Sequence, residues 1–106
     1  MAVDFEAVTQ ISRRYAQDVA RALPVSKAVL FGSYAKGTAD AQSDIDVCFF
    51  LDSYGGKRRM DVLEELLWMT YDYKGVYFEP MVFETSDLYN DNPFVKEVLR
   101  TGRDLL

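Results

Sequence analysis

The sequence contains no histidine and only one cysteine, Cys48. Without histidine, the chain cannot build a Ser-His-Asp or Cys-His nucleophilic site, and we do not expect a typical zinc site. With one cysteine, no disulfide can form within the chain. The groups left for chemistry are carboxylates, hydroxyls, lysine and arginine, and carboxylates favour hard cations such as Mg²⁺.

Long apolar runs are also missing, since none approaches the ~18 residues that a membrane-spanning helix needs. The first residues, MAVDFEAV, carry acid and lack the basic and apolar pattern of a secretory signal. Basic residues are in deficit, because 12 Lys and Arg against 17 Asp and Glu give a net charge of −5. We therefore expect a cytoplasmic protein with no membrane partner and no bulk attraction to nucleic acid.

The chain has 106 residues, of which 49% are hydrophobic and 27% are charged. These values are typical of a globular protein rather than a disordered one. At this length, one domain is the natural interpretation, and we expect it to span residues 1–106.

Apolar periodicity predicts alternating helices and strands. In chain order, the predicted segments are helix 4–23, strand 28–31, a helical turn and loop within 33–43, strand 44–51, turn 53–56, helix 58–73, strand 76–83, and a last helix from Asn92-Pro93 to Gly102. This α-β-α-β-α-β-α order predicts an α/β (α+β) fold, with helices packed on a small mixed sheet.

Two features of the later segments bear on the fold. Pro80 lies within strand 76–83, which indicates an edge strand or a bulge. Helix 58–73 is predicted from an apolar stripe at helical spacing, consisting of Met60, Leu63, Leu67 and Tyr71, widened by Leu66 and Trp68. We interpret Trp68, with Tyr71 and Tyr73, as core and rim residues rather than as a stacking or interface site.

Two aspartates open the second predicted strand, at Asp44 and Asp46. Side chains two apart in a strand point to the same face, so these carboxylates lie together while Ile45 and Val47 turn into the core. Two close carboxylates repel each other unless a cation lies between them. A pair that merely faces solvent is the alternative, but the apolar strand and the preceding Gly-Ser turn favour a metal site.

The pair Gly32-Ser33 ends the first predicted strand and begins a short helical turn. Glycine lets the backbone approach a ligand closely, and the first amides of a helix are free to bind a phosphate. Alone, this pair is an ordinary turn with Ser33 as the N-cap. Together with Asp44 and Asp46, it favours phosphate binding.

The stretch GSYAKGTADAQSDIDV resembles the signature of the DNA polymerase beta-like nucleotidyltransferase superfamily, and in particular its minimal nucleotidyltransferase domains. The resemblance extends from about residue 10 to the end of the chain. It implies that Gly32 and Ser33 hold the triphosphate of ATP, with Lys36 and Ser43 beside it. It also implies that Asp44 and Asp46 bind two Mg²⁺ ions.

The family uses a third carboxylate from a later strand, and the best match here is Glu79 in VYFEPMVF. An acid inside an apolar strand is costly unless it is paired, metal-bound or at an edge. The family more often has Asp at this place, and Glu84 and Asp87 are weaker candidates. Glu79 is thus expected as the third metal ligand and the base, with an exposed edge residue as the alternative.

Two smaller features remain. The cluster Lys57-Arg58-Arg59 follows a Gly-Gly turn and is interpreted as a solvated helix start, with phosphate or partner steering as the alternative. Cys48 shares the face of Asp46 and is interpreted as a small core residue.

The resemblance implies a Mg²⁺-dependent enzyme that transfers AMP from ATP to an acceptor hydroxyl. Because 106 residues form one domain, we expect no further acceptor-binding domain and expect the acceptor surface to come from a second copy or from another protein. Minimal members of the family pair with HEPN-domain toxins and act as antitoxins by AMPylation, which makes a HEPN toxin the expected partner. The alternatives are an inactive module that masks a partner, and a transferase for an aminoglycoside or an RNA end.

Overall fold

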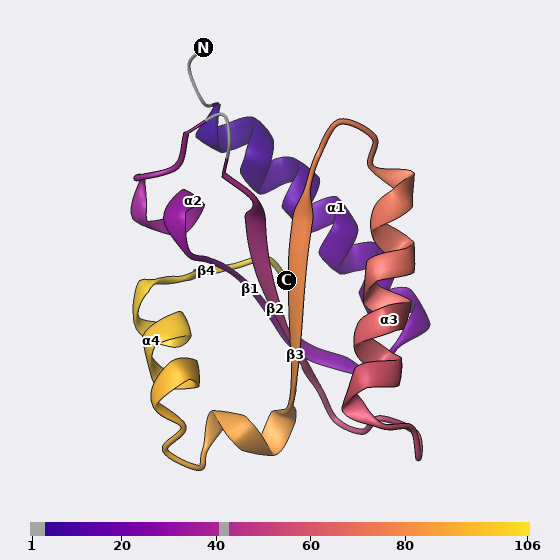
Figure 1. Ribbon diagram of the computed structural model, residues 1–106. Helices are drawn as coiled ribbons and strands as arrows, with labels where there is room; N and C mark the ends of the chain where they lie inside the picture. The colour runs from indigo at the N-terminus through magenta and orange to yellow at the C-terminus, as the bar shows by residue number, and fades with distance from the viewer. Residues whose placement is uncertain (1–3, 41–42) are drawn as a thin grey trace.

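The computed structural model describes residues 4–40 and 43–106. It contains a four-stranded sheet with helices on both faces (Figure 1). Residues 41 and 42 of the predicted loop lie outside this description, as do residues 1–3. In chain order, the elements are α1 (Phe5–Ala22), β1 (Val25–Phe31), α2 (Ser33–Lys36), β2 (Ile45–Leu51), α3 (Arg59–Met69), the 3₁₀ turn η1 (Thr70–Asp72), β3 (Phe78–Glu84), the 3₁₀ turn η2 (Thr85–Leu88), α4 (Pro93–Thr101) and β4 (Arg103–Asp104).

The sheet has the strand order β3-β2-β1-β4. β1 runs antiparallel to both β2 and β4, whereas β2 and β3 are parallel. This arrangement confirms the predicted mixed sheet. It also places β3 at the edge, where Pro80 costs no hydrogen bond on the open side, as its position in the sequence predicted.

One face of the sheet packs against α1 and α3 and forms the larger of two cores. α1 begins where the Asp4 carboxylate accepts a hydrogen bond from the Ala7 amide at 3.1 Å. Its buried side includes Tyr15, whose ring stacks on Phe78 at a centroid distance of 4.6 Å. The alternate residues of β2, Val47 and Phe49 among them, complete this core.

The other face of the sheet packs against α4 in a smaller core. The Asn92 side chain caps α4 by accepting hydrogen bonds from the amides of Phe94 and Val95, as the Asn92-Pro93 pair predicted. Cys48 is fully buried here, in agreement with its interpretation as a core residue. The same face carries the side chain of Asp46, two residues earlier in β2.

α3 differs from the prediction in the side that it buries. Its buried side chains are Val62 and Leu66, whereas Trp68 is 63% exposed and Tyr71 is 69% exposed. Of the three aromatic residues interpreted as core and rim, only Tyr73 is in the core. Apolar residues lie on both sides of this helix, so spacing alone does not identify the side that meets the sheet.

Other boundaries differ by a few residues. Helix 58–73 is α-helical only to Met69 and then tightens into η1, a usual way for a helix to end. The first strand extends back to Val25, and the third begins at Phe78 rather than at residue 76. The turn η2 and the two-residue strand β4 are additions to the predicted order. Within the described residues, no helix is long and apolar enough to span a membrane.

Candidate active site

The site begins at the turn between β1 and α2. Gly32 has φ = 74° and ψ = −150°, a conformation that is essentially restricted to glycine. A Cβ atom at this position would lie 2.2 Å from Oδ2 of Asp46, which is closer than two atoms can approach. Glycine is therefore required twice here, for the backbone conformation and for contact with the carboxylate. Gly32 also takes the N-cap position of α2, so the alternative with Ser33 as the N-cap is wrong.

β2 separates acidic from apolar side chains by simple alternation. Ile45 and Val47 are buried under α1 and α3, whereas Asp44 is exposed and Asp46 is half-buried. Asp44 immediately precedes the strand, and the Ile45 amide that follows it donates to the Tyr77 carbonyl at 2.8 Å. The negative charge of Asp44 raises the pKa of Asp46, which agrees with the prediction that the two carboxylates lie on the same side of this segment.

Glu79 lies directly beside Asp46, because the parallel pairing of β2 and β3 places these two residues in register. The pKa of Asp46 is raised to about 6, first by burial, then by the negative charges of Glu79 and Asp44 and by a hydrogen bond with Glu79. The structure therefore brings the three predicted carboxylates into one electrostatic group. On the other side of Asp46, its partner in β1 is Phe31, and Gly32 is the next residue of the chain.

These side chains do not yet enclose a metal ion. In residues 4–40 and 43–106, no three side chains of the Asp, Glu, Cys or His types stand close enough together to form a complete metal site. The donors are nevertheless oxygen atoms only, they carry like charges, and one of them is already protonated more readily than a free carboxylate. This chemistry fits a hard divalent cation such as Mg²⁺.

A family comparison decides the broad identity of the fold and site. The model of the nucleotidyltransferase domain family matches residues 12–101. The chain belongs to this family. No curated protein matches the sequence.

Two solved structures resemble the nucleotidyltransferase domain in fold. A putative nucleotidyltransferase from Sulfolobus solfataricus is 17% identical, with a TM-score of 0.65 over 94% of this chain and 80% of that chain. A toxin-antitoxin structure with AMP-PNP is 20% identical, with a TM-score of 0.58 over 89% of this chain and 72% of that chain. At these identities, the likeness concerns the fold alone.

The remaining predicted nucleotide ligands lie around α2. Ser33 is the first residue of α2 and is half-buried. Lys36 is exposed at the other end of α2, and its charge assists the Arg100 hydrogen bond in lowering the pKa of Glu97 on α4. The Ser43 hydroxyl accepts from the Asp40 amide at 3.0 Å and donates to the Asp40 carboxylate at 3.2 Å, so it is occupied within a turn.

Two weaker acidic candidates lie at the far end of β3. Glu84 is in register with Leu51, the last residue of β2, and Asp87 accepts a hydrogen bond from the Glu84 amide at 3.0 Å. Five residues of strand separate Glu84 from Glu79, or about 17 Å at ~3.3 Å per residue. These two acids cap η2 and do not join the candidate site.

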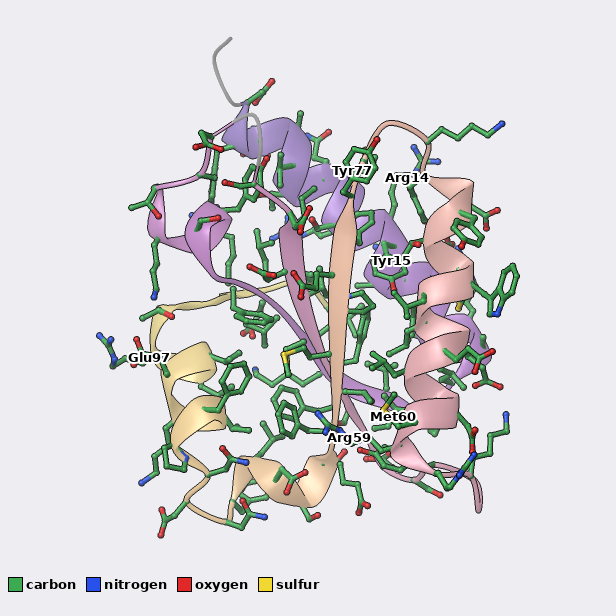
Figure 2. All side chains as sticks on the ribbon, viewed as in Figure 1. Arg14, Tyr15, Arg59, Met60, Tyr77 and Glu97 are labelled. Carbon is green, nitrogen blue, oxygen red and sulfur yellow. The ribbon has the colours of Figure 1, made fainter. Side chains whose placement is uncertain are left out.

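The basic cluster before α3 is engaged in local contacts. Lys57 pairs with Glu65, and Arg58 pairs with Asp61 at 3.2 Å. Arg59 donates to the Val82 carbonyl at 2.8 Å, at the opposite end of β3 from Tyr77 (Figure 2). The interpretation of this cluster as a helix start agrees with these contacts.

A cavity of about 400 Å³ opens beside the carboxylates on the β3 side. The cavity is lined by two of the three carboxylates, Asp44 and Glu79, and by residues of the segment that joins α3 to β3. The residues of that segment are Thr70, Tyr71, Tyr73, Lys74, Gly75, Val76, Tyr77 and Phe78. Sequence reasoning did not identify Tyr77 as part of the site. The sequence did contain a sign of this position, because Tyr77 and Glu79 are two residues apart in the predicted strand 76–83, and alternation places their side chains on one side.

One wall of this cavity is anchored to α1. The Tyr73 hydroxyl donates a hydrogen bond to Asp18, and its ring meets Tyr15 edge-on at 5.8 Å. Tyr15 in turn donates to the Leu66 carbonyl at 2.7 Å. Burial and the bond to Asp18 raise the pKa of Tyr73 to about 12. The loop next to the carboxylates is therefore held on α1 by a hydrogen bond and a ring contact, and α1 is bonded in turn to α3.

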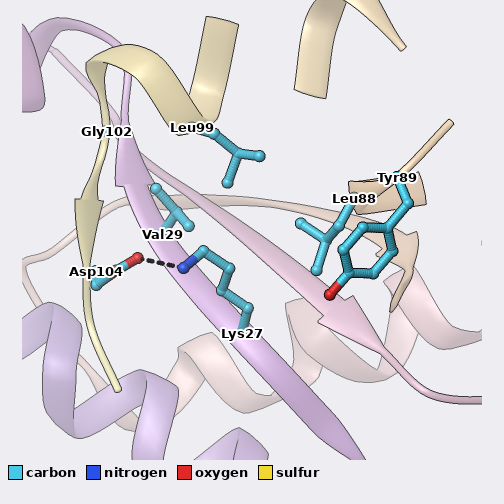
Figure 3. A pocket seen from close by; sticks show the side chains of 7 residues that line it. All are labelled: Lys27, Val29, Leu88, Tyr89, Leu99, Gly102 and Asp104. Atoms are coloured by element: carbon cyan, nitrogen blue, oxygen red, sulfur yellow. Dashed lines mark ion pairs between the residues drawn. The ribbon is translucent and has the colours of Figure 1, made fainter. Parts of the chain in front are cut away.

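A second cavity, also of about 400 Å³, lies between α4, η2 and the start of β1 (Figure 3). Here Lys27 Nζ forms an ion pair with Asp104 Oδ1 at 2.8 Å. Lys27 precedes Phe31, the neighbour of Asp46, by four residues of β1, or about 13 Å. This cavity is thus separate from the carboxylate group.

Proposed function

We propose that this nucleotidyltransferase domain transfers AMP from ATP to a hydroxyl group of a partner protein. The observation that carries the proposal is the position of Asp46. Its carboxylate abuts the Gly32 backbone on one side and Glu79 on the other, with the charge of Asp44 nearby. Such a group can join a bound triphosphate to an acceptor hydroxyl through divalent cations.

In this proposal, the phosphates lie at the β1–α2 turn. Gly32 leaves room beside Asp46 because it has no side chain. The first amides of α2 and the Ser33 hydroxyl would donate to the phosphate oxygens. Lys36 would add positive charge from the exposed end of α2, and the Ser43–Asp40 turn would shape the rim.

The three carboxylates have distinct tasks. Asp44 and Asp46, with Glu79, would hold Mg²⁺, which when bound supplies positive charge beside the entering and leaving oxygens. Glu79 would accept the proton of the acceptor hydroxyl as its oxygen bonds to the α-phosphorus. The bond from that phosphorus to pyrophosphate breaks in the same displacement, so AMP remains on the acceptor. Positioning and charge stabilisation supply most of the rate in such transfers.

A protein acceptor is favoured over a nucleic acid. The net charge is −5, and the cavity beside Asp44 and Glu79 has Lys74 as its one basic lining residue among the described residues. A polyanion would therefore meet repulsion at the point where its hydroxyl must enter. The fold likeness to a toxin-antitoxin structure with AMP-PNP supports a nucleotide and a partner protein. The family resemblance of the sequence makes a HEPN-domain toxin the proposed acceptor and an antitoxin the proposed role of this domain.

The test is transfer of label from [α-³²P]ATP, with Mg²⁺, to the protein encoded beside this chain. We expect label on a hydroxyl side chain of that protein and its loss with Asp44→Asn or Asp46→Asn. Mass spectrometry of the labelled protein should show the mass of one AMP group per modified residue. No transfer to any protein, with ATP and Mg²⁺ bound normally, would reject the proposal.

A second candidate is a module that masks its partner without catalysis. The incomplete enclosure of a metal ion by the described carboxylates is the observation that favours it. Under this alternative, the double variant Asp44→Ala and Asp46→Ala still neutralises the partner in a growth assay. Loss of neutralisation in that variant would instead support catalysis.

A further inference from the structure

α3 carries large apolar side chains on the side that faces away from the sheet. These side chains belong to Met60, Leu67, Trp68 and Tyr71. Their successive spacings of seven, one and three residues place them along one stripe of the helix and its 3₁₀ extension. The exposed fractions are 67% for Met60, 46% for Leu67, 63% for Trp68 and 69% for Tyr71. We call these four residues the α3 face. Because Val62 and Leu66 already fill the contact with the sheet, the α3 face has no role in the cores of the domain.

The α3 face leads directly to the candidate active site. The Trp68 and Tyr71 rings contact each other edge-on at a centroid distance of 5.3 Å. Tyr71 also lines the cavity that contains Asp44 and Glu79. A second hollow, of about 370 Å³, flanks Trp68 at the end of α1. Tyr71 therefore belongs both to the α3 face and to the lining of the cavity that contains the carboxylates.

We propose that the α3 face is the docking surface of the acceptor protein. This inference rests on the proposed transfer of AMP to a protein. A partner that binds Leu67, Trp68 and Tyr71 would place its hydroxyl side chain at the mouth of the cavity beside Asp44 and Glu79. Exposed aromatic residues in a continuous apolar patch are the usual anchors of such interfaces.

The charges on this surface specify the partner further. Glu64 lies between Met60 and Leu67 on the same stripe, Asp72 follows Tyr71, and both are exposed. An acceptor that presents apolar side chains with basic residues around them complements this arrangement. A second copy of the chain, docked by the same face through a two-fold axis, would bring the Glu64 and Asp72 carboxylates of both copies into one interface. RNA would meet the same negative charges.

The first experiment compares Trp68→Glu with Tyr89→Glu. Tyr89 is a matched control, because it is an aromatic residue, is 83% exposed and directly follows η2 beside the other cavity (Figure 3). Labelled ATP is added to soluble extract of source cells that lack the chain's own gene, together with each purified variant. We expect Trp68→Glu to lower transfer to the acceptor at least about tenfold, through the KM for the acceptor, and Tyr89→Glu to leave it unchanged.

ATP binding in the presence of Mg²⁺ and the thermal unfolding midpoint are measured on the same proteins. Both should be unchanged in Trp68→Glu, which separates docking from folding and from the nucleotide site. Equal transfer by Trp68→Glu and wild type would overturn the inference and leave the proposed function intact. Absence of transfer by the wild type would overturn both.

The second experiment identifies what touches the α3 face. A photo-crosslinking residue, p-benzoylphenylalanine, replaces Trp68 in one variant and Tyr89 in the other, and both are irradiated in the same extract. We expect Trp68→p-benzoylphenylalanine to crosslink the protein that also carries labelled AMP. Crosslinking only to a second copy, to RNA or to a protein without AMP would overturn the inference, as would equal crosslinking from position 89.

Discussion

The two cavities of this nucleotidyltransferase domain have the same volume, about 400 Å³, and opposite arrangements of charge. In one, the ammonium of Lys27 meets the carboxylate of Asp104 at 2.8 Å. In the other, Asp44 and Glu79 lie on the same side as Asp46, whose pKa is raised to about 6 by burial and by these like charges. Opposite charges that neutralise each other add a little stability, whereas gathered like charges reduce it. Carboxylates with a perturbed pKa of this kind cluster at functional sites, where a bound cation can supply the missing positive charge.

Removing one of the gathered charges should have the largest effect on activity. We expect Asp46→Asn to reduce AMP transfer at least about 100-fold, because the carboxylate central to the group is lost. The folded protein should become more stable, by about 1 kcal/mol once solvent screening is allowed for. The sign follows from the raised pKa, since ionising Asp46 at pH 7 costs more in the folded state than in the unfolded one. Label incorporation and thermal unfolding with EDTA measure the two effects.

Asp104→Asn in the other cavity is the control, and its transfer rate should match that of the wild type. Addition of Mg²⁺ should raise the unfolding midpoint of the wild type, because a ligand that binds only the folded state stabilises it. The same addition should leave Asp46→Asn unchanged. A wild-type rate in Asp46→Asn would remove the basis for treating the carboxylate group as the site of chemistry.

The turn beside Asp46 offers the next largest effect. In Gly32→Ala, the new Cβ would lie 2.2 Å from Oδ2 of Asp46, so the turn or the carboxylate must move. We expect at least about a tenfold loss of transfer, since displacements of ~1 Å are costly in positioned sites. Gly37→Ala is the matched control, because its φ of 75° is equally positive and no atom lies within 4 Å of the added Cβ.

Both glycine variants should lose about 1–2 kcal/mol of stability from the backbone alone, as chemical denaturation would show. If Gly37→Ala reduces transfer as much as Gly32→Ala does, backbone strain rather than contact with Asp46 is the cause. Equal activity in both variants and the wild type would indicate that the turn tolerates displacement.

The sequence predicted the parts of this site that depend on local spacing. Asp44 and Asp46 are two residues apart where β2 begins, so alternation places them together, and Gly32 follows β1 in a conformation that glycine permits. The contact between Asp46 and Glu79 depends on how two strands, separated by a helix, pair in register. Spacing within either strand carries no information on that register. The family resemblance therefore supplied Glu79, and the structure supplied its neighbour.

The outward side of α3 was beyond prediction for a related reason. Trp68 and Leu66 belong to two different apolar stripes of one helix, and periodicity does not say which of them the sheet covers. The two-residue strand β4 was also missed, because Arg103 and Asp104 are both exposed and show no apolar alternation. Long-range packing selects among patterns that are locally equivalent.

The anchor of the cavity wall should contribute a moderate effect. Tyr73→Phe removes the hydrogen bond to Asp18 but keeps the ring packed on Tyr15, so we expect a loss of about 1 kcal/mol in unfolding free energy. The bonds from Tyr73 and then Arg21 lower the pKa of Asp18 in the folded state. This contribution is present above the pKa of the unfolded Asp18 and is lost as the pH falls through the folded value.

The stability difference between Tyr73→Phe and the wild type should thus shrink as the pH drops below about 4, the ordinary pKa of aspartate. Urea denaturation at pH 7 and at pH 3 measures it. A difference that stays constant with pH would show that the Tyr73 hydroxyl acts through packing rather than through the Asp18 charge.

The smallest effect is expected where the charges already neutralise each other. Lys27→Met keeps the aliphatic stem in place on β1 and removes only the ammonium that meets Asp104. A partly exposed ion pair is worth about 0.2–1 kcal/mol, and a double-mutant cycle with Asp104→Asn should give a coupling energy in that range. The rate of AMP transfer should not change, because about 13 Å of strand separates this pair from Asp46. A large loss of transfer in Lys27→Met would instead make the second cavity part of the site, since the ion pair alone is too weak to act on the carboxylates through the fold.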